Sequence, residues 1–166
     1  AVQRAQRAQR NAHIGLIGPS GSGKTYTALM LAKGLAGPGG RIAVIDTENN
    51  SAALYADEFE FDVLNLDSFG PEVYIQAIRA AEEAGYDVLI IDSLSHAWAG
   101  KDGALEQVDK VARRMQTTNT FAAWREVTPR HNALVDAMVR CKCHLIVTMR
   151  AKTEYVVERD EKTGKT

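Results

Sequence analysis

The segment GPSGSGKT at residues 18–25 constrains the fold more than any other part of the chain. It fills the pattern of a glycine, four residues and then Gly-Lys-Thr. It follows the apolar run HIGLIG and precedes the helix-forming stretch GKTYTALMLAKGLA. Its glycines let the backbone curl so that successive amides point inward, and the start of the helix adds a positive dipole end. The sequence therefore predicts a strand, a phosphate-binding loop and a helix, in that order.

The loop residues are the first candidates for binding a nucleotide. Lys24 is expected to reach the β and γ phosphates and to act in catalysis, while the Thr25 hydroxyl is expected to bind Mg²⁺. ATP and Mg²⁺ are the cofactors that this loop predicts. The expected nucleotide-binding residues in and beside the loop are Gly18, Pro19, Ser20, Gly21, Ser22, Gly23, Lys24, Thr25 and Tyr26.

Short apolar runs alternate with amphipathic stretches along the chain. The runs at 13–18, 41–46, 61–66, 87–92 and 144–149 are expected strands. Expected helices occupy 23–36, 71–84, 104–116 and 130–141, the last with Pro129 in its first turn after a Thr128 cap. This alternation requires crossover connections, which predict a three-layer α/β/α sandwich around a mainly parallel sheet.

The two ends of the chain differ from its middle. Residues 1–12 repeat Ala-Gln-Arg and form an expected basic tail, and residues 13–166 form one expected domain. An alternating stretch at 153–158, followed by a turn signal at 162–164, predicts a C-terminal β-hairpin. Because the second strand of this hairpin would start where the sequence stops, residues beyond 166 are expected to exist in the parent protein or to be disordered.

Charge is balanced overall but segregated along the chain. Lys and Arg number 20 against 21 Asp and Glu. Residues 46–92 hold twelve acids and a single base, whereas residues 110–150 hold eight bases and two acids.

Cys141 and Cys143 are too close in sequence for an unstrained disulfide and too few for a closed zinc site. We expect both thiols to be reduced, which is typical of a cytoplasmic protein. Because no apolar run approaches the roughly 20 residues of a membrane helix, we expect no membrane partner.

Two acidic residues are expected to complete the site. Asp92 ends the apolar run DVLIID. A carboxylate at the end of a buried strand stands beside the phosphate loop and can hold Mg²⁺ through water. Ser93 is expected to assist. Since Lys24 and Asp92 must converge on one metal and phosphate group, strands 13–18 and 87–92 are expected to be neighbours. Glu48, two residues past Asp46, is the expected group that orients or deprotonates water.

The spacing Asp46-Thr47-Glu48 resembles that of RecA-like ATPases, in which this strand ends in Asp, any residue, Glu, and the Glu is the catalytic base. That family places a Tyr that stacks on adenine seven residues later, where this chain has Tyr55. A Tyr packed against the sheet is an equal alternative there. The end of strand LIVTMR carries a γ-phosphate sensor in the family, and Thr148 is the nearest match, with Arg150 beside it.

A narrower resemblance covers residues 13–166. The segments GPSGSGKTYTALMLAKGLA, VIDTE, DSLSHAW and VTMRAKTEYVVERDEKTGK look similar to small phage-encoded RecA-like proteins, some of them single-strand annealing and recombination ATPases of the Sak type. The resemblance implies a Mg²⁺-dependent ATPase domain that acts in phage DNA recombination or annealing. It also implies ATP and ADP as ligands, single-stranded DNA as a partner, a homo-oligomeric ring or filament, and the cytoplasm of a bacterial host.

Several residues have both a functional and a structural interpretation. His96 and Trp98 follow Asp92 in an expected loop where RecA-like proteins approach DNA, but a Trp there can also cover the edge of the core. The bases of 110–150 can face nucleic acid or a neighbouring subunit, or only solvent. Lys152 is a candidate for completing a neighbour's ATP site, with a structural role as its alternative. His131 and His144 lack partners at metal spacing and are expected to be structural.

Two other functions fit the same loop. A nucleoside or nucleotide kinase needs an Arg-rich lid and an acceptor pocket, and the only lid-like segment, 99–128, has three arginines without an evident acceptor site. A partition-type switch ATPase carries an extra Lys early in its loop, where this chain has Pro19 and Ser20. We therefore expect ATP hydrolysis, and keep the kinase as the alternative.

Overall fold

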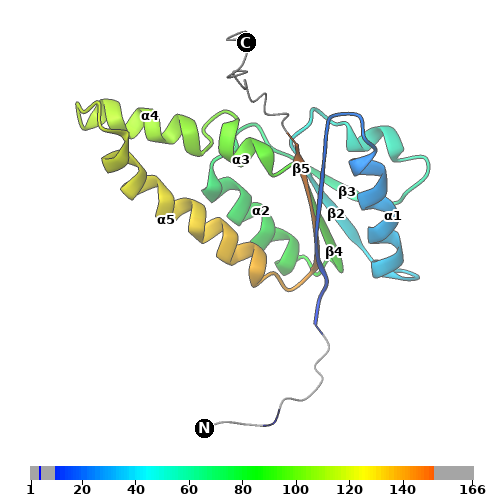
Figure 1. Ribbon diagram of the computed structural model, residues 1–166. Helices are drawn as coiled ribbons and strands as arrows, with labels where there is room; N and C mark the ends of the chain where they lie inside the picture. The colour runs from blue at the N-terminus through cyan, green and yellow to red at the C-terminus, as the bar shows by residue number, and fades with distance from the viewer. Residues whose placement is uncertain (1–3, 5–9, 152–166) are drawn as a thin grey trace, which may run out of the picture.

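The computed structural model describes residue 4 and residues 10–151. The expected C-terminal hairpin, Lys152 and most of the N-terminal tail lie outside the described residues. Within them the chain forms an α/β fold around one five-stranded sheet (Figure 1). None of the helices in this part of the chain has the length and apolar character that a membrane span requires.

All five strands are parallel and lie in the order β1-β5-β4-β2-β3. Their bounds are β1 His13–Gly18, β2 Ile42–Asp46, β3 Asp62–Asn65, β4 Val88–Asp92 and β5 His144–Arg150. The five apolar runs in the sequence therefore predicted the strands to within two residues at each end. In parallel strands the carboxyl ends share one edge of the sheet, so the residues that follow β1, β2, β4 and β5 meet there.

Helices cover both faces of the sheet, as the alternating pattern predicted. They are α1 Lys24–Ala36, α2 Pro71–Glu83, α3 Ser95–Ala99, α4 Ala104–Arg114 and α5 Thr120–Val139, with a 3₁₀ turn, η1, at Ala52–Tyr55. Alternate side chains of β4 point to opposite faces. Val88 and Ile90 pack on the α1 side, whereas Leu89 and Ile91 pack on the α2 and α5 side. The result is a three-layer sandwich.

The helical part between β4 and β5 differs from the prediction. Helix α5 begins at Thr120, ten residues before the expected start at 130, and Pro129 lies inside it. The Asn119 side chain caps this helix by accepting a hydrogen bond from the Phe121 amide at 3.0 Å. Packing of Ala123 and Val127 against α4 stabilises the turns that precede the proline. The expected loop with His96 and Trp98 is also partly helical, because it forms α3.

The expected contact between strands 13–18 and 87–92 is wrong, because β5 lies between β1 and β4. The phosphate loop nevertheless reaches β4. Thr25 belongs to the first turn of α1, and Ala28 and Leu29 of that helix pack on Val88 and Ile90 of β4 and on Ile146 of β5. Helix α1 therefore crosses the face of the sheet, and its start stands over β5 and beside the end of β4.

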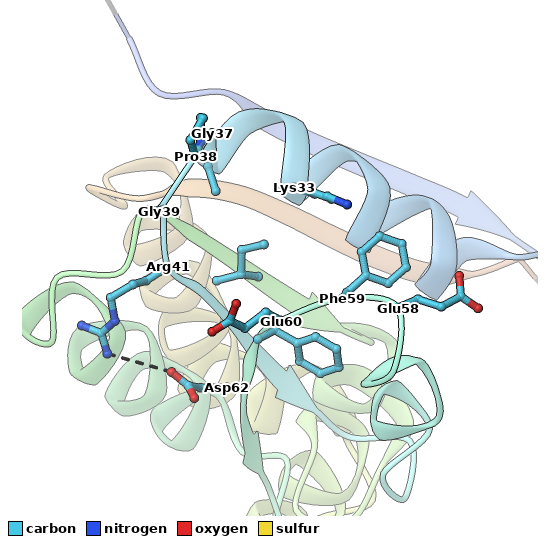
Figure 2. Close-up of a pocket in the computed structure, with 13 residues that line it drawn as sticks. Lys33, Gly37, Pro38, Gly39, Arg41, Glu58, Phe59, Glu60 and Asp62 are labelled. Atoms are coloured by element: carbon cyan, nitrogen blue, oxygen red, sulfur yellow. Dashed lines mark ion pairs between the residues drawn. The ribbon is translucent and has the colours of Figure 1, made fainter.

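A hollow of about 550 Å³ opens at the far end of α1 from the phosphate loop (Figure 2). Its walls are the last turn of α1, the turn at 37–40 and residues 58–62. Arg41 and Asp62, at its rim, form an ion pair at 3.9 Å. Because the hollow adjoins the C-terminal end of α1, it is separate from the edge of the sheet where the phosphate loop lies.

Candidate functional site

The phosphate loop has the backbone geometry of a cradle. Gly21 and Gly23 have φ values of 76° and 83°, in the left-handed region that favours glycine. The Pro19 carbonyl accepts hydrogen bonds from the Ser22 amide at 3.3 Å, the Ser22 hydroxyl at 2.8 Å and the Lys24 ammonium at 2.6 Å. The lysine head therefore lies against the loop itself, beside the first amides of α1. An anion bound at this helix start would meet both the amides and the ammonium.

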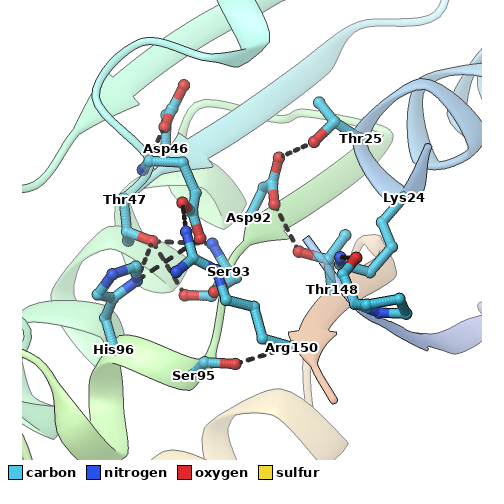
Figure 3. A network of polar contacts seen from close by, with 12 residues as sticks. Lys24, Thr25, Asp46, Thr47, Asp92, Ser93, Ser95, His96, Thr148 and Arg150 are labelled. Carbon is cyan, nitrogen blue, oxygen red and sulfur yellow. Dashed lines mark hydrogen bonds and ion pairs between the residues drawn. The ribbon is translucent and has the colours of Figure 1, made fainter. Parts of the chain in front are cut away.

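Asp92 lies at the centre of the site, at the end of β4. Its carboxylate is almost fully buried and accepts two hydrogen bonds. The Thr25 hydroxyl donates to Oδ2 at 2.6 Å, and the Thr148 hydroxyl donates to Oδ1 at 2.5 Å (Figure 3). The loop residue and the strand residue that the sequence singled out for one metal are therefore in direct contact.

The donors at this point fit the cofactors that the loop predicts. The Thr25 hydroxyl and the Asp92 carboxylate are hard oxygen donors, which Mg²⁺ prefers. Lys24 and the amides at the start of α1 are donors that suit phosphate oxygens. Thr25 and Asp92 would thus hold Mg²⁺, directly or through water, and Lys24 with the loop backbone would hold the phosphates of ATP.

Glu48 follows β2 in a turn that Asp46 shapes. The buried Asp46 carboxylate accepts hydrogen bonds from the Glu48 amide at 2.7 Å and from the Ala52 amide at 3.1 Å. In the register of β2 and β4, Asp46 is the partner of Asp92, and the Thr47 amide donates to the Asp92 carbonyl at 2.8 Å. Asp46 therefore has a structural role, and it places Glu48 at the same edge of the sheet as Asp92.

Two cationic or ionisable side chains lie against Glu48. The Arg150 guanidinium donates a hydrogen bond to Glu48 Oε2, and His96 Nδ1 lies 3.9 Å from Glu48 Oε1. The Glu48 side chain is only 18% exposed, whereas that of Arg150 is 44% exposed. No local pattern in the sequence predicts the Arg150–Glu48 pair, because 102 residues separate its partners.

A buried hydroxyl network supports the turn with Glu48. Thr47 Oγ1 donates to the Ser93 carbonyl at 3.1 Å, accepts from the Ser93 amide at 2.8 Å and lies 3.0 Å from His96 Nδ1. The Tyr74 hydroxyl also donates to the Ser93 carbonyl, at 3.0 Å, and burial raises the pKa of Tyr74. The Ser93 hydroxyl, which was expected to assist at the metal, is buried and has no hydrogen-bond partner among the described residues.

The two residues expected to contact the adenine and the γ-phosphate have other neighbours here. Tyr55, in η1, is partly buried, and its ring centroid lies 5.7 Å from that of Tyr26 on α1. Tyr26 in turn contacts Phe59, with centroids 5.5 Å apart. Thr148 is fully buried, and its hydroxyl donates a hydrogen bond to the Asp92 carboxylate. The contacts of Tyr26, Tyr55 and Thr148 with a nucleotide stay predictions.

The residues expected at a nucleic-acid surface are partly engaged within the chain. Trp98 is stacked on Trp124, with centroids 5.2 Å apart, and is still 44% exposed. Several of the bases in 110–150 have acidic partners. The ion pairs in this region are Lys110 with Asp102 and Glu106, Arg114 with Glu126, and Arg130 with Glu72 and Glu126. The basic surplus seen in the sequence is therefore smaller on the folded surface.

The chain is similar to known proteins over part or most of its length. A family model described as an AAA domain matches residues 10–166. The chain is also similar to the protein RecA of Clostridioides difficile (strain 630), with 34% identity over 86 residues. That match covers 49% of this chain and 25% of the relative, so the chain spans only about a quarter of the length of that curated protein.

Proposed function

Because the chain belongs to the AAA domain family of phosphate-loop NTPases, we propose that it is a Mg²⁺-dependent ATPase of RecA-like type that acts on single-stranded DNA in phage recombination or annealing. The observation that carries the ATPase part is the contact between Thr25 and Asp92, with Glu48 on the neighbouring strand end. The proposal is supported by the position of oxygen donors suited to Mg²⁺, of the glycine-rich loop and of the Glu48 carboxylate at one edge of the sheet, since hydrolysis requires groups of these three kinds.

Each residue has a separate task in this proposal. Lys24 and the loop amides hold the phosphates, and Thr25 and Asp92 hold the metal. A Mg²⁺ ion held by these residues would supply positive charge that offsets the charge developing on the transferred phosphoryl group. Glu48 orients the attacking water and accepts its proton, and the Asp46 carboxylate keeps the turn of Glu48 in place.

The part of the proposal that concerns DNA is supported by the partial similarity to RecA and by the half-exposed Trp98. It is also supported by exposed bases that have no ion-pair partner among the described residues, such as Arg125 and Arg140. We further propose that residues 13–166 form one ATPase domain preceded by a basic tail, and that protomers assemble head to tail. A protein with this role acts in the cytoplasm of a bacterial host.

Measurement of phosphate release from ATP, with and without Mg²⁺ and a single-stranded oligonucleotide, tests the proposal. We expect release that requires Mg²⁺ and rises several-fold with the oligonucleotide. The same assay with added nucleosides and nucleoside monophosphates, analysed for phosphorylated products, tests the kinase alternative. Transfer of phosphate to one of these acceptors in place of release to water would overturn the hydrolase assignment. A rate of ATP turnover that the oligonucleotide does not change would overturn the recombination role.

A further inference from the structure

His96 lies against the turn that carries Glu48. It belongs to α3, and its side chain is only 25% exposed. Its ring packs on Phe69, with centroids 4.9 Å apart, and its Nδ1 atom lies 3.0 Å from Thr47 Oγ1 (Figure 3). From the sequence, His96 was expected in a loop that approaches DNA, whereas in the fold it faces the proposed site of hydrolysis.

The hydrogen bonds of Thr47 determine which ring nitrogen of His96 carries a hydrogen. A hydroxyl donates one hydrogen bond and accepts two. The Thr47 hydroxyl donates to the Ser93 carbonyl at 3.1 Å and accepts from the Ser93 amide at 2.8 Å. Its second acceptor position faces His96 Nδ1. We therefore assign the hydrogen of the neutral imidazole to Nδ1, which donates to Thr47.

The same N–H group faces the proposed base. Glu48 Oε1 lies 3.9 Å from His96 Nδ1, and a carboxylate only accepts hydrogen bonds. This distance is too long for a direct hydrogen bond, and a shift of about 1 Å brings the pair within range. The other oxygen, Oε2, is bound by Arg150. Because the two oxygens have different donors, the rotation of the carboxylate about its last bond is restricted.

The support beneath His96 is rigid and does not depend on Glu48. On one side of His96, the Leu94 amide and the Ser95 hydroxyl are hydrogen-bonded to the backbone of β5, at 2.9 Å and 2.8 Å. On the other side, Ala97 is buried. The ring therefore has a fixed place relative to the turn after β2, which suits a task of orientation.

A purely structural role explains the contacts of His96 less well. Thr47 already makes two hydrogen bonds to Ser93, and the Asp46 carboxylate already holds the turn of Glu48. The imidazole therefore supplies no partner that this turn lacks. It adds a hydrogen-bond donor beside the carboxylate that is proposed to activate water.

We propose that His96 is a positioning residue for ATP hydrolysis: Thr47 fixes the hydrogen on Nδ1, and this N–H group orients Glu48 Oε1 toward the attacking water. Oε1 accepts from His96 at one of its positions and keeps the other for the water. The inference rests on the proposed ATPase function and adds a residue to its mechanism. His96 acts through Glu48 and needs no contact with the nucleotide, so its loss lowers kcat and leaves nucleotide binding intact.

Three substitutions at this position test the proposal through kcat and KM for ATP. His96→Asn puts an amide donor where Nδ1 lies, His96→Gln puts one where Nε2 lies, and His96→Ala has neither. We expect His96→Ala and His96→Gln to lower kcat about ten-fold with KM nearly unchanged, and His96→Asn to keep most of the wild-type kcat. His13→Ala, at the exposed start of β1, is the control and should change neither constant. Equal losses in all three variants, or rescue by His96→Gln only, would overturn the proposal.

A double variant tests whether His96 acts through Glu48. In the Glu48→Gln background, His96→Ala should change the single-turnover rate of hydrolysis less than about two-fold, because the carboxylate that it positions is gone. A further loss of about ten-fold in that background would show that His96 acts independently of Glu48 and would refute the proposal.

A nitrogen NMR spectrum of the imidazole groups tests the geometry without turnover. The His96 signals, identified by their loss in His96→Asn, should show the hydrogen on Nδ1 in the nucleotide-free wild type, and Thr47→Val should weaken this preference. A hydrogen on Nε2 in the wild type would overturn the proposal. A wild type with the hydrogen on Nδ1 that does not hydrolyse ATP would instead overturn the proposed function, and the role of His96 with it.

Discussion

The Thr25 hydroxyl and the Asp92 carboxylate are joined by a hydrogen bond of 2.6 Å across 67 residues of chain. Thr25 belongs to the start of α1, which follows β1, and Asp92 belongs to the end of β4. In the sheet, β5 lies between β1 and β4. This contact forms because α1 packs across both β5 and β4, which brings its first turn to the end of β4. It brings together the two oxygen donors that are proposed to hold Mg²⁺.

Lys24→Ala should abolish tight binding of ATP without unfolding the protein. The ammonium lies on the exposed loop and supports no part of the core, so its loss removes phosphate binding and little stability. Calorimetric titration with ATP and a thermal unfolding curve are the two measurements. Lys33→Ala, at the other end of the same helix, is the control and should bind ATP normally. Undiminished ATP binding by Lys24→Ala would contradict the assignment of the loop.

Glu48→Gln should bind nucleotide but turn it over at least about 100-fold more slowly. The amide keeps the shape of the side chain but cannot accept a proton from water. Steady-state phosphate release at saturating ATP measures the effect, with the exposed Glu83→Gln on α2 as the control. Normal hydrolysis by Glu48→Gln would show that the base lies elsewhere.

Thr148→Val should destabilise the fold by about 1–3 kcal/mol, the typical cost of leaving a buried polar group without its partner. The change preserves the shape of the side chain but removes the donor to Asp92 Oδ1. Urea unfolding gives the free energy, and Thr148→Ser should recover most of the loss because it restores the hydroxyl. A valine variant as stable as the wild type would show that this hydrogen bond contributes nothing to the fold.

The stability of the protein should fall with rising pH above about 9, in part through Cys143. Burial raises the pKa of this thiol from its ordinary value of 9.0 to about 12, so the unfolded chain loses the proton before the folded one does. The thiol's contribution is therefore complete below pH 9 and is lost between pH 9 and 12. Urea unfolding of the wild type and Cys143→Ala at pH 8 and pH 10 measures it. The wild type should lose more stability over this interval, and equal losses would exclude Cys143 as a cause.

Assembly on DNA should depend on ATP and on salt. Sedimentation of the protein with ATP and a single-stranded oligonucleotide should show a ring or filament, in which a neighbouring protomer supplies further positive charge to the ATP site. The logarithm of the binding constant should fall with the logarithm of salt by about 0.7 per phosphate contacted. A protein that stays monomeric and does not bind the oligonucleotide at low salt would contradict the recombination role and leave only the proposed ATPase activity.

Local patterns in the sequence determined much of the fold and of the list of site residues. The apolar runs predicted the five strands of the sheet, and continuous burial explains the pattern for β2, β4 and β5, whereas β3 at one edge of the sheet is exposed along its length. The glycine pattern predicted the phosphate loop, because only glycine adopts the φ values of Gly21 and Gly23 without strain. Lys24, Thr25, Glu48 and Asp92 were predicted as site residues in the same way, from their positions at the ends of predicted elements, and the structure brings Thr25 and Asp92 into contact.

Only the tertiary structure decided how these elements meet. The insertion of β5 between β1 and β4, the early start of α5 and the pairing of Arg150 with Glu48 all depend on contacts between segments far apart in the chain. Sequence periodicity reports which face of an element is buried but not which element buries it. For the same reason the sequence identified Asp92 and Thr148 separately, whereas the hydrogen bond between them follows from the packing of β4 beside β5.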